Sequence, residues 1–257
     1  MVLIDLRRIF GKNRRIFSAL ALVLAVVLIL WTVNNPAIVG ASAVQRLLPV
    51  YCVQREDKMV AISFDAAWGN EDTQTLIDIL SQHGVNATFF VVGDWVDRYP
   101  DSVKALSDAG NEVMNHSSTH AHFASLSEPE IVSDLTACNG KIEAITGVTP
   151  TLFRCPYGEY DDHVIQAVNR TGMTAIQWDV DSLDWKGISA AEIQKRVLDR
   201  VQPGSIVLFH NAAEHTPEAL PGILDALQAE GYTIVPISQI LLEGNTTIDH
   251  TGRQCPA

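Results

Sequence analysis

The sequence predicts an α/β fold, an irregular (β/α) barrel of about seven parallel strands that is preceded by an N-terminal transmembrane helix. From residue 59 onward, strand-like apolar runs alternate with amphipathic helical patterns. Several of these runs are continuously apolar, as is typical of strands covered on both faces. The alternation extends to about residue 240, and a run of that length favours a closed or nearly closed barrel over an open sheet.

The expected strands are seven short apolar runs. They cover residues 59–64, 87–92, 112–115, 151–153, 173–178, 205–209 and 232–235. Because strands that alternate with helices are joined by crossover connections, the sheet is expected to be parallel.

The expected helices carry their own start and stop signals. Asp72 is a candidate N-cap for a helix that ends at Gly84. A later helical pattern places Pro217 directly after the candidate cap Thr216. Capping boxes are expected at two pairs, Ser127 with Glu130 and Ser189 with Glu192.

The N-terminus differs from the rest of the chain in composition. Residues 1–15 are basic, residues 16–33 are uncharged and mostly apolar, and about 20 such residues cross a hydrocarbon core as a helix. The basic flank predicts a cytoplasmic N-terminus, a transmembrane anchor over 16–33 and a single-pass protein of the cell membrane whose catalytic domain is extracytoplasmic. The alternative is a cleaved signal peptide, with "ASA" at 41–43 as the cleavage site, which would give a secreted protein.

The remaining chain is expected to consist of an extracytoplasmic linker over 34–57, a folded domain over 58–245 and a C-terminal tail over 246–257. The formal net charge is −12 although the first residues are basic, and this speaks against nucleic acid as a partner. The cysteines form no C-x-x-C pair, so a zinc ribbon or a thioredoxin-type redox site is not expected. Cys52 and Cys255 flank the folded segment, where an exported protein could form a disulfide; unpaired buried thiols are the alternative.

Polar residues follow the expected strands at their C-terminal ends. In chain order they are Asp65, His116 and His120, Arg154, Asp181 and Asp184 with Trp185, and His210. Parallel β/α sheets and barrels place their chemistry at that edge, so these side chains are expected to lie around one site.

Each of these residues also has a structural interpretation. His116 and His120 are spaced i, i+4, which on a helical turn would direct both imidazoles to one divalent metal ion, whereas lone histidines are often satisfied in a core. His122 is interpreted as a supporting or structural residue. Asp65 could be a catalytic base, or else a helix cap or an ion-pair partner, and His210 a general acid or a core histidine. Arg154 could form a structural ion pair with Asp181 or Asp184, or position a catalytic group.

Taken together, the motifs resemble the polysaccharide deacetylases that share the NodB homology domain, carbohydrate esterase family 4. The resemblance covers about residues 55–240 and rests on five ordered segments: "SFDAAWG", "HSSTH", "RCPYG", "DSLDW" and "LFH". The "AAWGNEDT" variant is most similar to the sporulation-type members. The family implies a NodB-like barrel and hydrolysis of an N-acetyl group on an amino sugar to a free amine and acetate.

The resemblance assigns a role to each matching residue. It implies a divalent metal, zinc or else cobalt or nickel, on His116 and His120. Asp65 would be the base, Arg154 would tune it with the help of Asp181 or Asp184, and His210 would be the acid. Substrate contacts would come from the backbone N–H and ring of Tyr157, from Trp185 and from Leu208, which would line a pocket for the acetyl methyl group.

One position departs from the family pattern. Ala66 stands where the family has a second aspartate that completes the metal site. Glu71 or Asp72 could replace this ligand, the metal could bind loosely, or the domain could have kept sugar binding and lost catalysis. The sequence thus predicts a membrane-anchored, metal-dependent N-deacetylase of amino-sugar polymers, with peptidoglycan as the expected substrate. The alternative is a weakened deacetylase-like domain that binds wall glycan.

Overall fold

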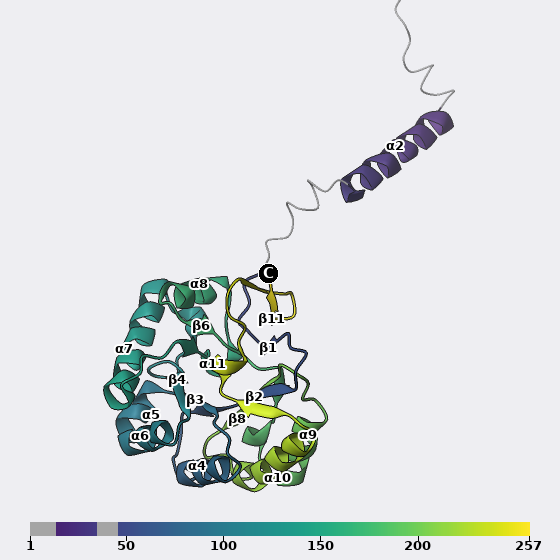
Figure 1. The fold of residues 1–257 in the computed structure, drawn as a ribbon. Coiled ribbons are helices and arrows are strands. Elements are labelled where there is room, and N and C mark those ends of the chain that lie inside the picture. The colour runs from purple at the N-terminus through teal and green to yellow at the C-terminus, as the bar shows by residue number, and fades with distance from the viewer. Residues whose placement is uncertain (1–13, 35–45) are drawn as a thin grey trace, which may run out of the picture. The chain divides into compact units, whose positions relative to one another are not determined.

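The computed structural model describes residues 14–34 and 46–257. Residues 47–257 form one compact unit, and the helix α2 (Arg14–Asn34) belongs to a separate one. Figure 1 shows the compact unit as a central sheet with helices packed around it. The predicted α/β fold with a curled parallel sheet is confirmed.

The central sheet has eight strands, and every pair in it is parallel. The strands are β2 (Met59–Ala66), β3 (Thr88–Val91), β4 (Glu112–Asn115), β5 (Leu152–Phe153), β6 (Thr174–Ala175), β7 (Val180–Asp181), β8 (Ile206–His210) and β9 (Thr233–Val235). Their order is β6-β5-β4-β3-β2-β8-β7, and β9 pairs with the start of β2. β7 is the strand that the sequence did not predict.

The sheet is strongly curled. β6 and β7 lie at its opposite edges, yet only residues 176–179 connect them. A connection of this length spans at most about 18 Å when fully extended. The two edges must therefore lie closer together than in a flat sheet, and the strands form a curled half-barrel that is open between β6 and β7.

Helices cover the outside of this sheet (Figure 1). They are α4 (Thr73–Gln82), α5 (Gly93–Arg98), α6 (Pro100–Asp108), α7 (Glu128–Thr146), α8 (Asp162–Arg170), α9 (Ala190–Leu198) and α10 (Thr216–Ala229). The short helix α11 (Ile237–Ile240) packs instead on the other face of the sheet, in one cluster with Ala61 and Phe90. Both predicted capping boxes are present, at the starts of α7 and α9. α7 ends at Gly147, whose left-handed φ of 73° suits glycine.

Asp72 occupies the predicted N-cap position of α4, whereas the predicted cap Thr216 of α10 is wrong, and neither side chain caps its helix. The carboxylate of Asp72 makes no cap hydrogen bond and instead accepts from the Ala212 N–H at 2.9 Å. The cap position of α10 is His215, and the hydroxyl of Thr216 donates to Asp184 at 2.7 Å. A distant partner has displaced the local cap in each case.

The two faces of β2 carry different cores. Phe64 and Ala66 point toward the helices, where Phe64 stacks on Phe89 and Phe209 at centroid distances of 4.7 and 5.5 Å. Ala61 belongs to a second cluster with Phe90 and other residues. Because successive side chains of a strand alternate between faces, Asp65 points to the side opposite Ala66.

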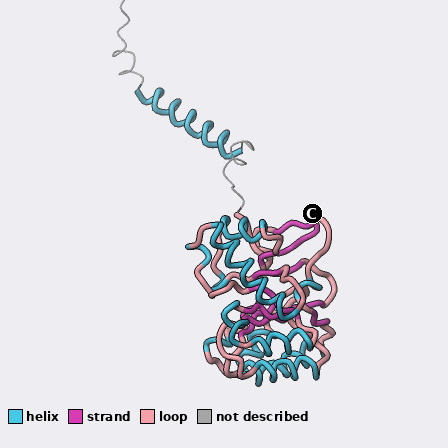
Figure 2. Tube along the Cα trace, turned by 90° about the vertical axis from the view of Figure 1, so that its left-hand side faces the viewer, coloured by secondary structure: helices cyan, strands magenta, loops and turns pink. Residues whose placement is uncertain are grey.

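The two ends of the compact unit meet in a small second sheet. β1 (Cys52–Val53) pairs in parallel with β11 (Arg253–Pro256), which pairs antiparallel with β10 (Thr246–Ile248). Figure 2 shows these strands at the end of the barrel that carries the C-terminus. All four cysteines are free thiols, including Cys52 and Cys255.

The predicted single-pass membrane location is wrong on the structural finding. Within the described residues, no helix combines the length and the apolar character needed to cross a bilayer. The basic residues before position 14 and the candidate cleavage site at 41–43 lie outside the described residues.

Candidate active site

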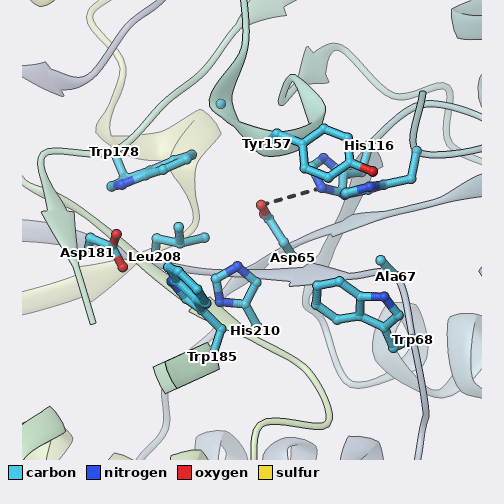
Figure 3. A pocket seen from close by; sticks show the side chains of 12 residues that line it. Asp65, Ala67, Trp68, His116, Tyr157, Trp178, Asp181, Trp185, Leu208 and His210 are labelled. Atoms are coloured by element: carbon cyan, nitrogen blue, oxygen red, sulfur yellow. Dashed lines mark ion pairs between the residues drawn. The ribbon is translucent and has the colours of Figure 1, made fainter. Parts of the chain in front are cut away.

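The predicted site residues gather around one pocket at the C-terminal edge of the sheet. The pocket has a volume of about 400 Å³. Figure 3 shows its polar side chains directed toward one another between several aromatic rings. Of the predicted residues, those that line it are Asp65, His116, His120, Tyr157, Asp181, Trp185, Leu208 and His210. Strands distant in sequence therefore supply a single site, as expected for parallel strands.

Asp65 is a buried carboxylate held by a buried cation. Its side chain accepts a hydrogen bond from Arg154 Nη1 at 2.8 Å, and Arg154 is fully buried just after β5. Burial by itself would raise the pKa of Asp65, but the charge and hydrogen bond of Arg154, together with the charge of His210, outweigh it and the pKa is lowered. Asp65 is therefore ionised at neutral pH.

Arg154 is fixed by contacts other than those predicted. Its Nη2 donates to the carbonyl oxygen of Gln177 at 3.1 Å, and its guanidinium lies 4.2 Å from the ring centroid of Phe90. Neither Asp181 nor Asp184 pairs with it among the described residues. The expectation that one of these aspartates fixes Arg154 is wrong, because their carboxylates bind elsewhere.

Asp184 holds His210 instead. The Asp184 carboxylate accepts from His210 Nδ1 and from the His210 backbone N–H, both at 2.8 Å. Burial alone would lower the pKa of His210, but the hydrogen bond to Asp184 and the nearby carboxylates raise it. His210 is therefore poised to carry a proton, and its Nε2 is the ring nitrogen not used by Asp184. The Asp181 carboxylate accepts from the Leu183 N–H at 2.8 Å.

The acid and the base are neighbours across two strands. Asp65 of β2 and His210 of β8 are register partners in the parallel ladder. Adjacent strands lie about 4.8 Å apart, and paired residues point to the same face. This register places an ionised carboxylate beside a protonatable imidazole on the same face of the sheet.

His116 and His120 approach each other, but not on a helical turn. The segment between them is a loop in which Ser117 and His120 have left-handed φ values of 71° and 56°. The ring centroids are nevertheless 5.0 Å apart. The Nδ1–H of His116 donates to the Arg154 carbonyl oxygen at 2.8 Å, which leaves Nε2 with its lone pair free at 3.5 Å from the Asp65 carboxylate.

Both of these imidazoles are neutral at pH 7. Burial lowers the pKa of His116, and burial together with the neighbouring His116 lowers the pKa of His120 to about 4. His122 lies outside this pair: its Nδ1 meets the Glu159 carboxylate at 2.8 Å, and its ring stacks on Tyr157 at 4.3 Å between centroids. His122 thus contacts Tyr157 and not the Asp65 carboxylate.

The substrate-side residues form the walls of the pocket. Tyr157 and Trp185 are 56% and 55% exposed, and Leu208 of β8 is buried at the floor. The Tyr157 N–H donates to no acceptor among the described residues. At Gly158 the φ is +69°, and a Cβ there would lie 3.0 Å from the Trp178 ring, so this turn requires glycine.

Strained backbone is concentrated in the loops that build this pocket. Five non-glycine residues have left-handed φ values: Ser117, His120, Tyr157, Leu183 and Ala212. All five follow strands at the C-terminal edge of the sheet. Such conformations are costly, persist where the surroundings impose them, and cluster at functional sites.

Sequence reasoning missed two tryptophans of the pocket. Trp68 follows β2 and Trp178 lies between β6 and β7, and both line the cavity. Trp178 also lies 5.6 Å from the Arg154 guanidinium. The signal for Trp68 was present in the segment "AAWG", where a large aromatic residue follows two alanines.

Among the described residues, His116 and His120 are the candidate metal-ligating pair of the site, and a third protein ligand is not in place. Within residues 14–34 and 46–257, no group of three or more histidine, cysteine, aspartate or glutamate side chains is placed to hold a metal ion. Ala66 is buried in the apolar cluster on the helix side of β2. Neither Glu71 nor Asp72 lines the pocket, and the Asp72 carboxylate binds the Ala212 N–H. The residues present do not fit a firmly held resident ion.

Comparisons with known proteins agree with this architecture. The polysaccharide deacetylase family profile matches residues 53–176. The chain is 30% identical to the peptidoglycan-N-acetylmuramic acid deacetylase PdaA of Bacillus subtilis, with 79% of this chain and 78% of that protein covered. It is 31% identical to a peptidoglycan-N-acetylglucosamine deacetylase of Bacillus cereus, with 69% of this chain covered and 66% of that protein, slightly under two thirds of its length.

One solved structure of similar fold belongs to a family member that is described as a pseudoenzyme. BA3943 of Bacillus anthracis, described as a carbohydrate esterase family 4 pseudoenzyme, superposes with a TM-score of 0.72 at 36% identity, covering 75% of this chain and 68% of that one. A mutant of BA3943, described as having restored enzymatic activity, gives 0.73 and 38% over 75% and 70%.

The curled parallel sheet, with a carboxylate and an imidazole paired across two strands at its C-terminal edge, defines a hydrolase-type α/β domain. The ordered motifs and the matching relatives specify it further. The chain belongs to the polysaccharide deacetylase family.

Proposed function

We propose that this protein is an N-deacetylase of peptidoglycan that hydrolyses the N-acetyl group of an amino sugar. The observation that carries this proposal is the complementary protonation of two register partners. Asp65 has a lowered pKa and His210 a raised one, so the base is ionised and the acid protonated in the same pH range. Amide hydrolysis needs both at once, because water must lose a proton and the leaving nitrogen must gain one.

In the proposed mechanism, the acetyl carbonyl carbon lies between Asp65 and His210 when the reaction begins. Asp65 takes a proton from the attacking water, and Arg154 keeps its carboxylate ionised and oriented. The tetrahedral intermediate then collapses as His210 gives its ring proton to the sugar nitrogen. Asp184 fixes the His210 ring and stabilises its protonated form. The products are acetate and a free amine.

The pocket walls suit the rest of this substrate. The Tyr157 N–H, which has no acceptor among the described residues, would donate to the oxyanion that forms on the acetyl oxygen. Leu208 supplies an apolar floor for the acetyl methyl group, and the exposed rings of Tyr157 and Trp185 flank the sugar.

His116 and His120 are proposed as the residues that would contact a divalent ion, zinc or else cobalt or nickel, because imidazole is a suitable ligand for such ions. Two imidazoles alone bind such an ion weakly. Losing a third protein ligand weakens binding by one or more factors of ten, or about 1.4 kcal/mol each. An ion held there would polarise the acetyl oxygen. The two proton transfers are carried out by Asp65 and His210.

A second candidate function is glycan binding without catalysis. It is favoured by Ala66, which removes a ligand of the family pattern, and by the similarity to a family member described as a pseudoenzyme. The retained pairs of Asp65 with Arg154 and of His210 with Asp184 support the catalytic proposal instead.

Acetate release decides between the two functions. The full chain is incubated with acetylated peptidoglycan, with and without added zinc, and Asp65→Asn is measured beside it. We expect the wild type to release acetate and Asp65→Asn to lower the rate by at least about 100-fold, the usual contribution of a general base. Glycan binding by the wild type with no acetate under either condition would reject catalysis in favour of the binding function.

A further inference from the structure

Trp68 is an exposed aromatic side chain in the middle of the candidate site. It is 56% exposed, whereas Trp95 in the same region is 1% exposed and belongs to the core. Its ring centroid lies 6.1 Å from that of His120 and 6.3 Å from that of His210. The roles derived so far for the site residues leave this ring without a function.

The backbone on both sides of Trp68 is fixed. The Ala67 N–H donates to the Asn211 side chain at 3.3 Å, and the Gly69 carbonyl oxygen accepts from Trp95 Nε1 at 2.9 Å. The Asn211 side-chain amide also donates to Gly69. Two anchors from separate elements thus hold the residues before and after Trp68, so the ring is presented in a set position.

Trp68 lies across the reacting groups from Trp185. Figure 3 shows Trp68 on one side of His210 and Asp65, and Trp185 on the other. With the acetyl group of the reacting sugar between Asp65 and His210, Trp185 and Trp68 lie on opposite sides of the reacting group. The next sugar of a polymer on the Trp68 side then lies against an exposed indole face.

The exposed indole face of Trp68 is suited to contact a sugar ring. An aromatic face is electron-rich and attracts the polarised C–H groups that line one face of a pyranose. The ring of Trp68 contacts the imidazoles of His120 and His210, and no cation lies over it among the described residues. The outer surface of the indole is therefore available to an apolar sugar face.

We propose that Trp68 binds the sugar unit adjacent to the one that reacts, so that the site selects chains of N-acetylated amino sugars over the single sugar. This inference rests on the proposed function for the identity of the reacting unit. A simple shielding role for Trp68 over the two imidazoles would make no distinction between a chain and a single sugar.

The test measures binding and not turnover. Asp65→Asn in the full chain is the parent, because its hydrolysis is expected to be at least about 100-fold slower. Trp68→Ala, Trp68→Phe, Trp185→Ala and Val148→Ala are added to it singly. Val148 is 58% exposed, lies in the α7–β5 connection and does not line the pocket, so it controls for loss of an exposed apolar side chain. Titration calorimetry is run with the tetramer and the monomer of N-acetylglucosamine.

We expect Trp68→Ala to weaken tetramer binding by about tenfold, equal to about 1.4 kcal/mol. Monomer binding should change less than about twofold, and Trp68→Phe should keep most of the tetramer affinity because it keeps an aromatic face. Val148→Ala should match the parent for both ligands, and the melting temperatures should confirm that all variants fold.

Three results would overturn the inference: no tetramer binding by the parent, tetramer affinity of Trp68→Ala within twofold of the parent, or equal weakening for tetramer and monomer. Acetate release by the wild type is measured separately. If it fails while the tetramer affinity still depends on Trp68, the proposed hydrolysis is rejected and the binding role of Trp68 stands.

Discussion

Replacing Asp184 with asparagine tests how the acid is kept protonated. The Asp184 carboxylate accepts from His210 Nδ1 at 2.8 Å, the His210 N–H at 2.8 Å, the Thr216 hydroxyl at 2.7 Å and the Trp185 N–H at 2.9 Å. An asparagine keeps one acceptor oxygen and turns an NH₂ group toward donors. The substitution therefore removes the charge and opposes at least one of these hydrogen bonds.

The size of the effect follows from the bond to His210. A hydrogen bond to a charged group contributes about 1.5–3 kcal/mol, and one pKa unit corresponds to about 1.4 kcal/mol. The pKa of His210 should therefore fall by about 1–2 units in Asp184→Asn. Because His210 must be protonated to act as the acid, the high-pH limb of the rate profile should move to lower pH by the same amount.

The His210–Asp184 pair should also affect how the free energy of unfolding depends on pH. The folded-state pKa of His210 is raised, so its pairing stabilises the fold below the unfolded value of about 6.5, and this contribution is lost as pH rises through the folded pKa. Asp184→Asn should remove that pH dependence. It should also lower the free energy of unfolding by about 1–3 kcal/mol, because buried donors lose their acceptor.

The assay is the pH dependence of acetate release, together with an NMR titration of the His210 ring that does not depend on turnover. Asp181→Asn is the matched control, since its carboxylate raises the pKa of His210 only through space and makes no hydrogen bond to that ring. An unchanged His210 titration in Asp184→Asn, or an equal shift in Asp181→Asn, would refute the reasoning.

Two further predictions concern the base and the metal. Arg154→Met should lower the free energy of unfolding at pH 7 by about 3–5 kcal/mol, because Asp65 is left buried without its cation. Denaturant unfolding should show a smaller loss of unfolding free energy at pH 4 than at pH 7, because Asp65 is neutral at pH 4 in the variant. An equal loss at the two pH values would contradict this account. Ala66→Asp should lower the melting temperature without metal, because a carboxylate enters an apolar cluster, and added zinc should recover it if the new ligand joins His116 and His120. Ala66→Asn is the control for that variant. If zinc does not change the melting temperature of Ala66→Asp, position 66 cannot reach the histidine pair.

Much of the fold could be predicted because its signals are local. Seven of the eight strands were visible as apolar runs, and both capping boxes formed where serine and glutamate have the required spacing. The strand β7 (Val180–Asp181) was missed because Val180 stands between Asp179 and Asp181, so the sequence shows no apolar run there. The pairing of β1 with β11 joins the two ends of the compact unit, and no local pattern predicts it.

The site was predictable in its members and less so in its contacts. Motif positions at strand ends identified Asp65, Arg154, His116 and His210, and the pocket brings all of them except the buried Arg154 to its lining. The partner of Asp184 was assigned wrongly, because the choice between Arg154 and His210 depends on which strand lies beside β7. Trp68 was overlooked because exposure after folding cannot be read from one aromatic letter.

The sequence by itself determined that this chain alternates strands and helices and carries ionisable residues after its strands, because periodicity and capping act over a few residues. Only the tertiary structure decided that β8 lies beside β2, that Asp184 serves His210, and that Ala66 points into an apolar cluster. These outcomes depend on sheet order and strand register, which are set by packing between segments far apart in the chain.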